Sequence, residues 1–316
     1  MLAQDGTCAD ALDPTTIKQR KYDGTRTFII KEGNKVRLMG ARNWKNDYSK
    51  QHPELAAEAR KIPVKQGVFD AELTYFIKGT NDDKFLTALA KKSTMEKEGV
   101  EPKLMIFDVL QINNAKVTNL PYKERDKLLE TTIPKDLKLI EKVESSTDGK
   151  KMLKATANNE GIVVKDPECK YELNKRSKCL LKVKNWLSDE AIAIGYTQGK
   201  GAKAPTFGAL VLAQYNKEGN LQYVGKASGF TQTGTKEMLE KLNKIKVPEK
   251  PENVVGVQDG VKAWVKPKVV VEVKYLERTN KGILRQPDYM RERTDKPLKD
   301  VTLKTNRQRM TACDIK

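Results

Sequence analysis

Histidine is almost absent from the 316 residues of this chain, and this scarcity narrows the chemistry that the protein can perform. His52 is the single histidine, so a histidine triad or proton shuttle is disfavoured and catalysis must rest on lysine, arginine and carboxylates. We expect His52 to be a surface residue before Pro53. The four cysteines form no CxxC pair, which argues against both a zinc site and a disulfide framework.

Long apolar runs are also missing. No stretch approaches the roughly 20 residues that a membrane helix needs. The first residues contain neither a basic leader nor a long apolar segment, so we expect no secretory signal in the sequence as given and a cytoplasmic protein with no membrane contact.

Positive charge, in contrast, is abundant. Lysine and arginine total 60 against 42 aspartates and glutamates, which gives a formal net charge of +18. This surplus favours a polyanionic partner, with a basic surface that only maintains solubility as the alternative. The hydrophobic content of 38% and the periodic apolar runs indicate a folded protein, and the length suits two domains.

The pattern of elements changes near residue 187. Residues 1–187 mix strand and helix patterns, including a helix expected at 83–98, and predict an α+β domain of mixed antiparallel sheets with helices. Residues 188–316 show short strands between glycine-rich turns, which predict a small β-barrel. We expect one helix there, at 235–246, and a loosely ordered basic tail from residue 298.

Lys21, in the run KYDGTR, is the most informative single residue. A lysine on a tight Asp-Gly turn suits phosphoryl transfer, because the neutral amine is a nucleophile and nearby cations or desolvation can lower its pKa. Four residues could supply such cations if the fold gathers them: Arg20, Arg26, Lys182 and Lys184. The alternative is a hairpin turn with exposed charges.

Further motifs follow Lys21 in order: MGARN, FDAELTYF, LMIFDVL, EGIVVK, LLKVKNW and RERTDK. Together they resemble the covalent nucleotidyltransferase superfamily of DNA ligases, RNA ligases and mRNA capping enzymes, over nearly the whole chain. FGALVL and YVGKASGF resemble paired strands of the OB domain of ATP-dependent DNA ligases. The resemblance implies a nucleotidyltransferase (adenylation) domain at 1–187, an OB-fold domain at 188–316, and a minimal ATP-dependent DNA ligase.

The resemblance also implies roles for individual residues. Lys21 would attack the α-phosphate of ATP, with Arg26 near the ribose or the phosphates. Arg42 would contact the ribose and the 5′-phosphate of a nick. Glu72 would accept a hydrogen bond from a ribose hydroxyl, and Phe107 would stack on the purine, although a core phenylalanine is the alternative.

The residues of the later motifs would bind the metal ion and the phosphates of the nucleotide. Glu160 would help to hold Mg²⁺ (or Mn²⁺), which prefers carboxylate oxygens, and Lys182 and Lys184 project from one face of a strand toward the α-phosphate. The last motif comes from the second domain and would orient the β- and γ-phosphates through three residues: Arg293, Asp295 and Lys296.

Two features differ from many ligases. Gln19 stands where a glutamate usually reads the adenine amino group; an amide oxygen could accept the same bond. The segment between IAIGYT and FGALVL is too short for a DNA-encircling latch, so we expect Lys200 and Lys203 to help a monomeric protein hold nicked duplex DNA.

Other readings stay open at this point. RNA ligases share the lysine and the EGxV pattern but generally lack an OB domain with RxDK, and capping enzymes use GTP and favour aspartate at the position of Glu160. A non-catalytic DNA-binding protein on a degenerate ligase scaffold is the alternative from another class. NAD⁺-dependent ligation is disfavoured, because the zinc-ligating cysteines and the additional N-terminal domain of that group are not seen in this sequence.

Overall fold

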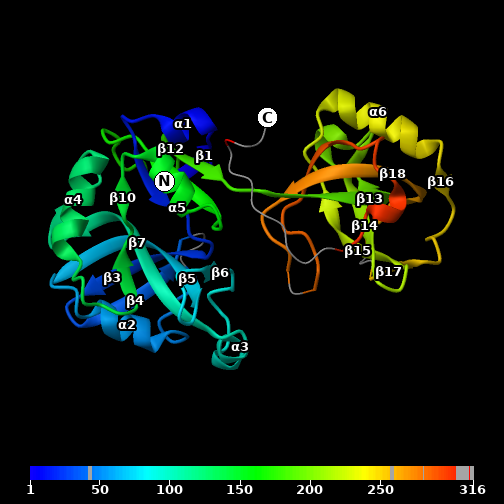
Figure 1. Ribbon diagram of the computed structural model, residues 1–316. Helices are drawn as coiled ribbons and strands as arrows, with labels where there is room; N and C mark the ends of the chain where they lie inside the picture. The colour runs from blue at the N-terminus through cyan, green and yellow to red at the C-terminus, as the bar shows by residue number, and fades with distance from the viewer. Residues whose placement is uncertain (42–44, 257–259, 280, 304–312, 314–316) are drawn as a thin grey trace. The chain divides into compact units, whose positions relative to one another are not determined.

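The computed structural model describes all residues except 42–44, 257–259, 280, 304–312 and 314–316. The chain divides into two compact units, of which the first is Met1–Asn185 with Thr311–Lys316 and the second is Trp186–Met310 (Figure 1). Each unit has its own hydrophobic core. Among the described helices, none has the length and apolar character needed to cross a membrane.

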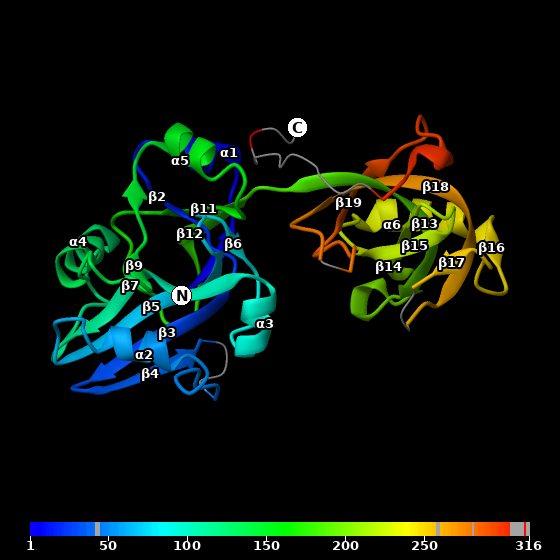
Figure 2. The same cartoon turned by 60° about the horizontal axis from the view of Figure 1, so that its bottom comes forward.

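The described part of the first unit contains two sheets (Figures 1 and 2). The smaller sheet has the strand order β1 (Leu2–Asp5), β12 (Arg176–Lys184), β11 (Gly161–Lys165), β2 (Ile17–Arg20), β10 (Ser145–Ser146). The larger sheet has the order β4 (Lys35–Gly40), β3 (Thr25–Glu32), β5 (Gln66–Ile77), β7 (Val100–Ile112), β8 (Ala115–Lys116), with β6 (Asp83–Lys84) on β5 and β9 (Ile140–Lys142) on β7. The described helices of this unit are α1 (Cys8–Leu12), α2 (Pro53–Ala59), α3 (Lys92–Lys97), α4 (Tyr122–Thr132) and α5 (Gly149–Ala155).

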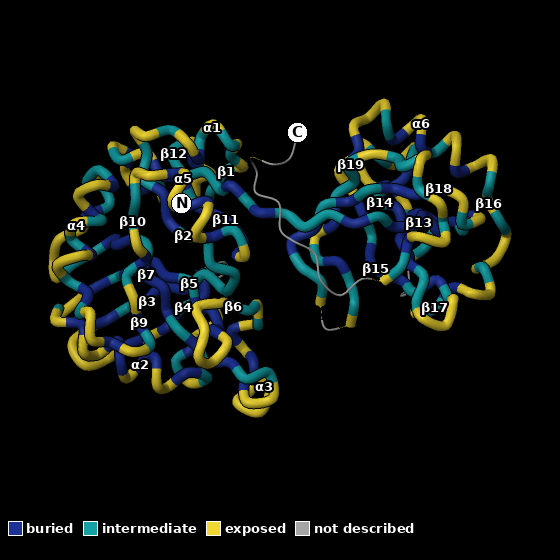
Figure 3. Tube along the Cα trace, in the orientation of Figure 1, coloured by how far each residue is buried: buried dark blue, intermediate teal, exposed yellow. Residues whose placement is uncertain are grey.

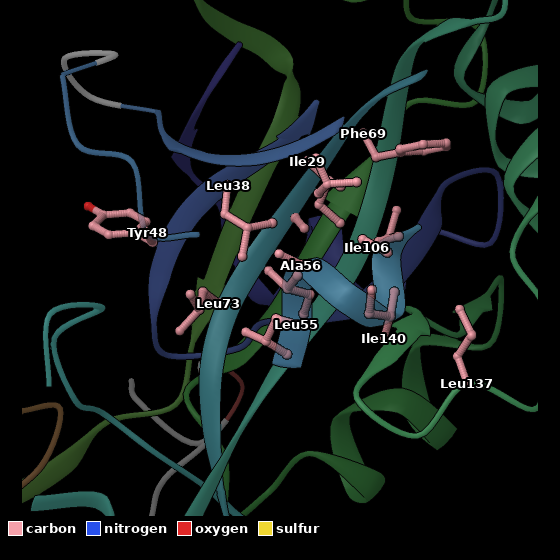
Figure 4. Packing of buried hydrophobic residues seen from close by; sticks show 14 of the residues in the cluster. Ile29, Leu38, Tyr48, Leu55, Ala56, Phe69, Leu73, Ile106, Leu137 and Ile140 are labelled. Carbon is pink, nitrogen blue, oxygen red and sulfur yellow. The ribbon is translucent and has the colours of Figure 1, made fainter. Parts of the chain in front are cut away.

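Helix α2 covers one face of the larger sheet and closes the main core of the first unit. Pro53 stands at the start of this helix, where its fixed φ suits the first turn and its missing N–H is not needed. Leu55 of α2 is fully buried and packs in one cluster with Leu73 of β5 and Ile106 of β7 (Figure 4). The core therefore fixes β5 and β7, the strands that carry Glu72 and Phe107.

The second unit is one curled sheet with a helix on it. In the described residues its strands are β13 (Leu187–Gln198), β14 (Phe207–Tyr215), β15 (Leu221–Ala227), β16 (Lys246–Val247), β17 (Val254–Val255), β18 (Ala263–Tyr275) and β19 (Asp288–Glu292), in the order β16-β18-β13-β14-β15-β17 with β19 on β18. Ala191 and Ala193 pack with residues of α6 (Gln232–Asn243), whereas Ile192 and Ile194 belong to a separate cluster. Both faces of β13 are therefore buried (Figure 3).

The helix of the second unit begins earlier than the sequence pattern predicts. The side chain of Thr231 accepts a hydrogen bond from the backbone N–H of Gly234 and caps α6, so the helix starts at Gln232, three residues before the expected start at Thr235. The expected loosely ordered tail is also wrong for its first part. Residues 298–300 form a 3-10 turn, and the carbonyl of Val301, which is 1% exposed, accepts a hydrogen bond from the N–H of Tyr215.

The helix expected at 83–98 is wrong over its first half. Residues 83–84 pair with β5, and only Lys92–Lys97 is helical. The carbonyls that a helix would use internally are taken by other side chains: Tyr75 donates to Thr87 O at 3.0 Å and His52 Nε2 lies 2.9 Å from Ala88 O. These tertiary hydrogen bonds override the local helical spacing. His52 is fully buried here, so the expectation of a surface histidine is also wrong.

The cysteines are paired, which corrects the expectation of no disulfide framework. Cys8 is bonded to Cys313, 305 residues away, and Cys169 is bonded to Cys179. Neither pairing leaves a short spacing signal, because one joins distant ends of the chain and the other joins the loop after β11 to a residue within β12.

We predict that the Cys169–Cys179 bond stabilises the protein mainly by restricting the unfolded chain. Replacing both cysteines by alanine removes a cross-link with a sequence separation of 10, which is worth about 3 kcal/mol by loop-closure entropy. Urea unfolding of the variant and of the wild-type protein measures the loss. Equal stabilities, or free thiols in the unfolded and unreduced wild-type protein, would contradict the assignment.

Candidate active site

A pocket in the first unit brings together residues from both sheets. In the smaller sheet, Val163 of β11 pairs with Gln19 of β2 on one side and with Lys182 of β12 on the other. These three side chains therefore lie in a row on one face, and all three line the pocket. From the larger sheet and the turn after β2, the pocket receives four more of the predicted residues: Lys21, Arg26, Glu72 and Phe107.

Two glycines allow the strands to approach closely beside Lys21. Gly161 has φ +137°, and a Cβ there would lie 2.2 Å from Val183 O, so only glycine fits. Its carbonyl accepts a hydrogen bond from the N–H of Lys21 at 2.9 Å. A Cβ on Gly24 would lie 2.2 Å from Leu73 O. The KYDG and EG motifs thus place the backbone of Lys21 beside that of Glu160.

Lys21 and Glu160 form an ion pair at the centre of the site. Lys21 Nζ donates to Glu160 Oε2 at 2.6 Å, and the Glu160 side chain is 6% exposed. Desolvation lowers the pKa of Lys21, but the charge and the hydrogen bond of Glu160 outweigh it, with help from Glu72, so the pKa is raised. The expected lowering by neighbouring cations is therefore wrong for this arrangement, because carboxylates rather than cations dominate around Nζ.

Glu72 lies in the same electrostatic environment. Desolvation is the largest cause that raises the pKa of Glu72 to about 8; Glu160 adds to it, and Lys21 opposes it. Two carboxylates that repel each other beside a pocket lined by lysines and arginines suit a divalent cation, which would neutralise them. The described residues contain no cluster of three or more metal-ligating side chains, so protein ligands would be completed by phosphate oxygens and water, as is common for Mg²⁺.

Arg26 is fixed by a residue that the sequence did not single out. Its Nε and Nη2 atoms donate to the two oxygens of fully buried Asp70 at 2.9 and 2.5 Å. Tyr171 accepts a third bond from Arg26 Nη2 at 2.8 Å and donates to Asp70 at 2.6 Å. Asp70 and Glu72 are two apart on β5 and both line the pocket, so strand alternation could have found Asp70. Tyr171 comes from a loop and leaves no comparable signal.

Phe107 borders the pocket next to a buried lysine. Phe107 is partly buried, and its carbonyl accepts a hydrogen bond from Lys165 Nζ at 2.7 Å. The same ammonium lies 5.1 Å from the centre of the Phe107 ring and 4.1 Å from that of Tyr122. Lys165 ends the EGIVVK motif, two residues after Val163 and on the same face, and this periodicity could have identified it as a pocket residue.

The two strand lysines differ in their surroundings. Lys182 lines the pocket and pairs with Asp5 at 3.3 Å. Lys184 does not line this pocket; desolvation lowers its pKa, Glu160 opposes that shift, and Lys21 adds to it. Both therefore contribute positive charge near Lys21.

The remaining predicted residues lie elsewhere. Arg42 falls outside the described residues. In the second unit, Arg293 pairs with Glu190 at 2.9 Å and with Asp295 at 2.8 Å, and its hydrogen bond lowers the pKa of Asp295 to about 2. Three further lysines also belong to this unit: Lys200, which is exposed, Lys203, at the end of a 3-10 turn, and Lys296.

Two protein families match successive parts of the chain. Residues 1–184 match the ATP dependent DNA ligase domain, and residues 203–296 match the ATP dependent DNA ligase C terminal region. The multifunctional non-homologous end joining protein LigD of Mycolicibacterium smegmatis is 27% identical over 94% of this chain and 38% of its own length. DNA ligase 1 of Methanosarcina mazei is 29% identical over 90% of this chain and 56% of its own length. The chain thus spans less than two thirds of either relative.

A solved structure resembles this chain over nearly its whole length. A mycobacterial DNA ligase D complexed with ATP and MES is 25% identical, with a TM-score of 0.52, over 96% of this chain and 97% of that chain. With the two family matches, this likeness confirms the predicted fold, a nucleotidyltransferase domain followed by an OB-fold domain.

We predict that Lys165 makes stability depend on pH. Desolvation lowers the pKa of Lys165 to about 8, against about 10.4 for an unfolded lysine. Between these values the unfolded chain binds more protons than the folded one, so stability rises with pH through this window. Relative to Lys165→Met, the wild-type protein should gain up to about 3 kcal/mol between pH 7 and 10.5. Urea unfolding of both proteins checks this, and a constant difference across the window would disprove it.

Proposed function

The chain belongs to the family of ATP-dependent DNA ligases, and from this premise we propose that it seals nicks in duplex DNA through AMP carried on Lys21. The observation that carries the proposal is the position of Lys21 Nζ, which lies in the pocket and 2.6 Å from Glu160. An amine held in a pocket that is lined by arginines, further lysines and carboxylates matches the requirements of nucleotidyl transfer.

In the first step, Lys21 Nζ attacks the α-phosphorus of ATP. A nitrogen–phosphorus bond forms, the bond from the α-phosphorus to the bridging oxygen breaks, and pyrophosphate leaves. Lys21 must first release to solvent the proton that the ion pair with Glu160 retains. Arg26 is oriented by Asp70 to meet the ribose or the phosphates, and Lys182 contributes charge beside the α-phosphate.

We further propose that Glu160, with Glu72 beside it, holds Mg²⁺ (or Mn²⁺). When bound, this ion would neutralise charge that develops on the transferred phosphoryl group. Glu160 would then no longer hold the proton on Lys21, which removes the main cause of its raised pKa. Glu72 would also accept a hydrogen bond from a ribose hydroxyl. Phe107 would stack on the adenine, and Gln19 would accept a hydrogen bond from the adenine amino group.

Two further transfers complete sealing. AMP passes from Lys21 to the 5′-phosphate of the nick, and the 3′-hydroxyl then attacks that phosphate and releases AMP. We propose that the OB-fold unit contributes to the reaction in two ways. Arg293, Asp295 and Lys296 orient pyrophosphate in the first step, and Lys200 and Lys203 contact the DNA backbone. We propose a monomer, with Arg42 at the 5′-phosphate.

The location of the reaction follows from its substrate. We propose that the protein works where DNA is replicated or repaired, in the cytoplasm. Two disulfides are typical of oxidising compartments, so the thiol state of the four cysteines in intact cells tests this location. Reduced cysteines in cells would support the cytoplasm, whereas cysteines bonded as they are in this structure would place the protein in an oxidising compartment.

We predict that α-labelled ATP with Mg²⁺ transfers label to the wild-type protein but not to Lys21→Ala. The alanine removes the only atom that forms the phosphoramidate, so the adduct should disappear completely. Denaturing gel electrophoresis measures it. Exposed Lys61 provides a matched control, and Lys61→Ala should label normally.

Two comparisons separate the alternatives. Label transferred to the protein from GTP in place of ATP would favour a capping-type enzyme. In a sealing assay, joining of nicked RNA in place of nicked DNA would favour an RNA ligase. Absence of an adduct on folded wild-type protein would reduce the chain to a DNA-binding protein on a ligase scaffold.

We predict that Lys200→Glu with Lys203→Glu weakens binding to nicked DNA. If each lysine neutralises one phosphate, its loss lowers the slope of log affinity against log salt by about 0.9. Titration of labelled nicked duplex between 50 and 200 mM salt, concentrations at which such contacts are strongly screened, measures both effects. Adduct formation on Lys21 should be retained, and unchanged affinity at moderate salt would show that these lysines do not hold the DNA.

A further inference from the structure

Gln19 has one half of its side-chain amide paired and the other half unpaired. Its Nε2 donates to Ser145 Oγ at 3.0 Å, and Ser145 is its direct partner on the neighbouring strand β10. Gln19 is 1% exposed and lines the pocket, and its Oε1 atom is buried without a hydrogen-bond partner among the described residues. A buried acceptor that faces a pocket is available to a donor from a bound ligand, or to a water molecule when the pocket is empty.

The orientation of the Gln19 amide is set by Asp126, which binds Ser145. Ser145 Oγ, Tyr122 OH and Lys142 Nζ lie 3.0, 3.2 and 3.2 Å from the same oxygen of Asp126. A carboxylate that receives an ammonium and two hydroxyls acts only as an acceptor. The single proton of Ser145 therefore goes to Asp126, and only its lone pairs face Gln19.

We propose that Asp126 and Ser145 are positioning residues that make the protein select adenine over guanine by fixing the orientation of the Gln19 amide. With Ser145 able only to accept, Nε2 must point to it and Oε1 must point into the pocket. Adenine presents an amino group at C6, which can donate to Oε1, whereas guanine presents a carbonyl oxygen there. A guanine would place two acceptors together and leave both unpaired, which disfavours it about 10- to 100-fold.

A glutamine needs this arrangement and a glutamate does not. Both oxygens of a carboxylate accept hydrogen bonds, so a glutamate at position 19 would read an amino group in either orientation. A glutamine that turned over would present Nε2 to the pocket and would accept guanine O6 instead. The chain from Asp126 through Ser145 prevents that reversal. This inference rests on the proposed use of ATP by the same pocket.

The test compares the binding of ATP and GTP by calorimetry in buffer without divalent metal, on protein treated with pyrophosphate to remove carried AMP. Asp126→Ala frees the proton of Ser145 to donate to Gln19, and the ratio of ATP to GTP affinity should fall about tenfold or more. Ser145→Ala should lower the ratio similarly, because Nε2 loses its acceptor. Lys142 retains Glu130 at 3.2 Å in Asp126→Ala, which limits the disturbance.

Three controls separate orientation from general damage. Asp126→Asn keeps an oxygen that can accept from Ser145 and should preserve the preference. Glu130→Gln removes a charge from the same helix and from the same lysine without touching Ser145, and should also preserve it. In a Gln19→Glu background, Asp126→Ala should leave the ratio unchanged, because a carboxylate needs no orientation.

Each outcome decides the inference. An unchanged ratio in both alanine variants overturns it, as does an equal loss in Asp126→Asn and Asp126→Ala, or a wild-type protein without preference. If Asp126→Ala fails to fold by circular dichroism, Ser145→Ala decides alone. Failure to form the Lys21 adduct while the binding preference is intact overturns only the proposed function.

Discussion

The ion pair between Lys21 and Glu160 is the interaction on which the arrangement of the pocket depends. The two residues lie 139 positions apart, and the backbone bond from Lys21 N–H to Gly161 O brings them together at the ends of β2 and β11. The close approach needs Gly161, whose φ no other residue adopts easily. The same contact keeps the amine charged, so the group that positions the nucleophile also restrains it.

Around this pair the pocket is built from buried charges that are fixed in pairs. Arg26 is held by Asp70. Arg125 donates two hydrogen bonds of 2.8 and 3.0 Å to Asp108, and the side chains of Arg125 and Asp108 are both nearly inaccessible to solvent. Removing one partner of such a pair leaves an uncompensated buried charge, commonly at a cost of about 3–5 kcal/mol. The paired charges keep their geometry while a polyanionic substrate enters, because their rotamers are fixed by the fold rather than by the ligand.

The sequence predicted the order of the motifs, the two-part fold and the residues around Lys21, because strand alternation and short motifs keep such residues on one face. It did not predict features that depend on distant parts of the chain. The segment at 83–98 lost its helix to hydrogen bonds from Tyr75 and His52, and the pKa of Lys21 followed a carboxylate 139 residues away. The hydrogen bonds that orient Gln19 come from Ser145 of β10 and Asp126 of α4, and no motif marks either of these two residues.

The bond between Cys8 and Cys313 turns most of the chain into a covalent ring. The second unit lies within that ring, since Trp186–Met310 is joined to the first unit at both of its ends. A single proteolytic cut anywhere between the two cysteines would leave both fragments covalently joined, and only reduction of the disulfide would release them.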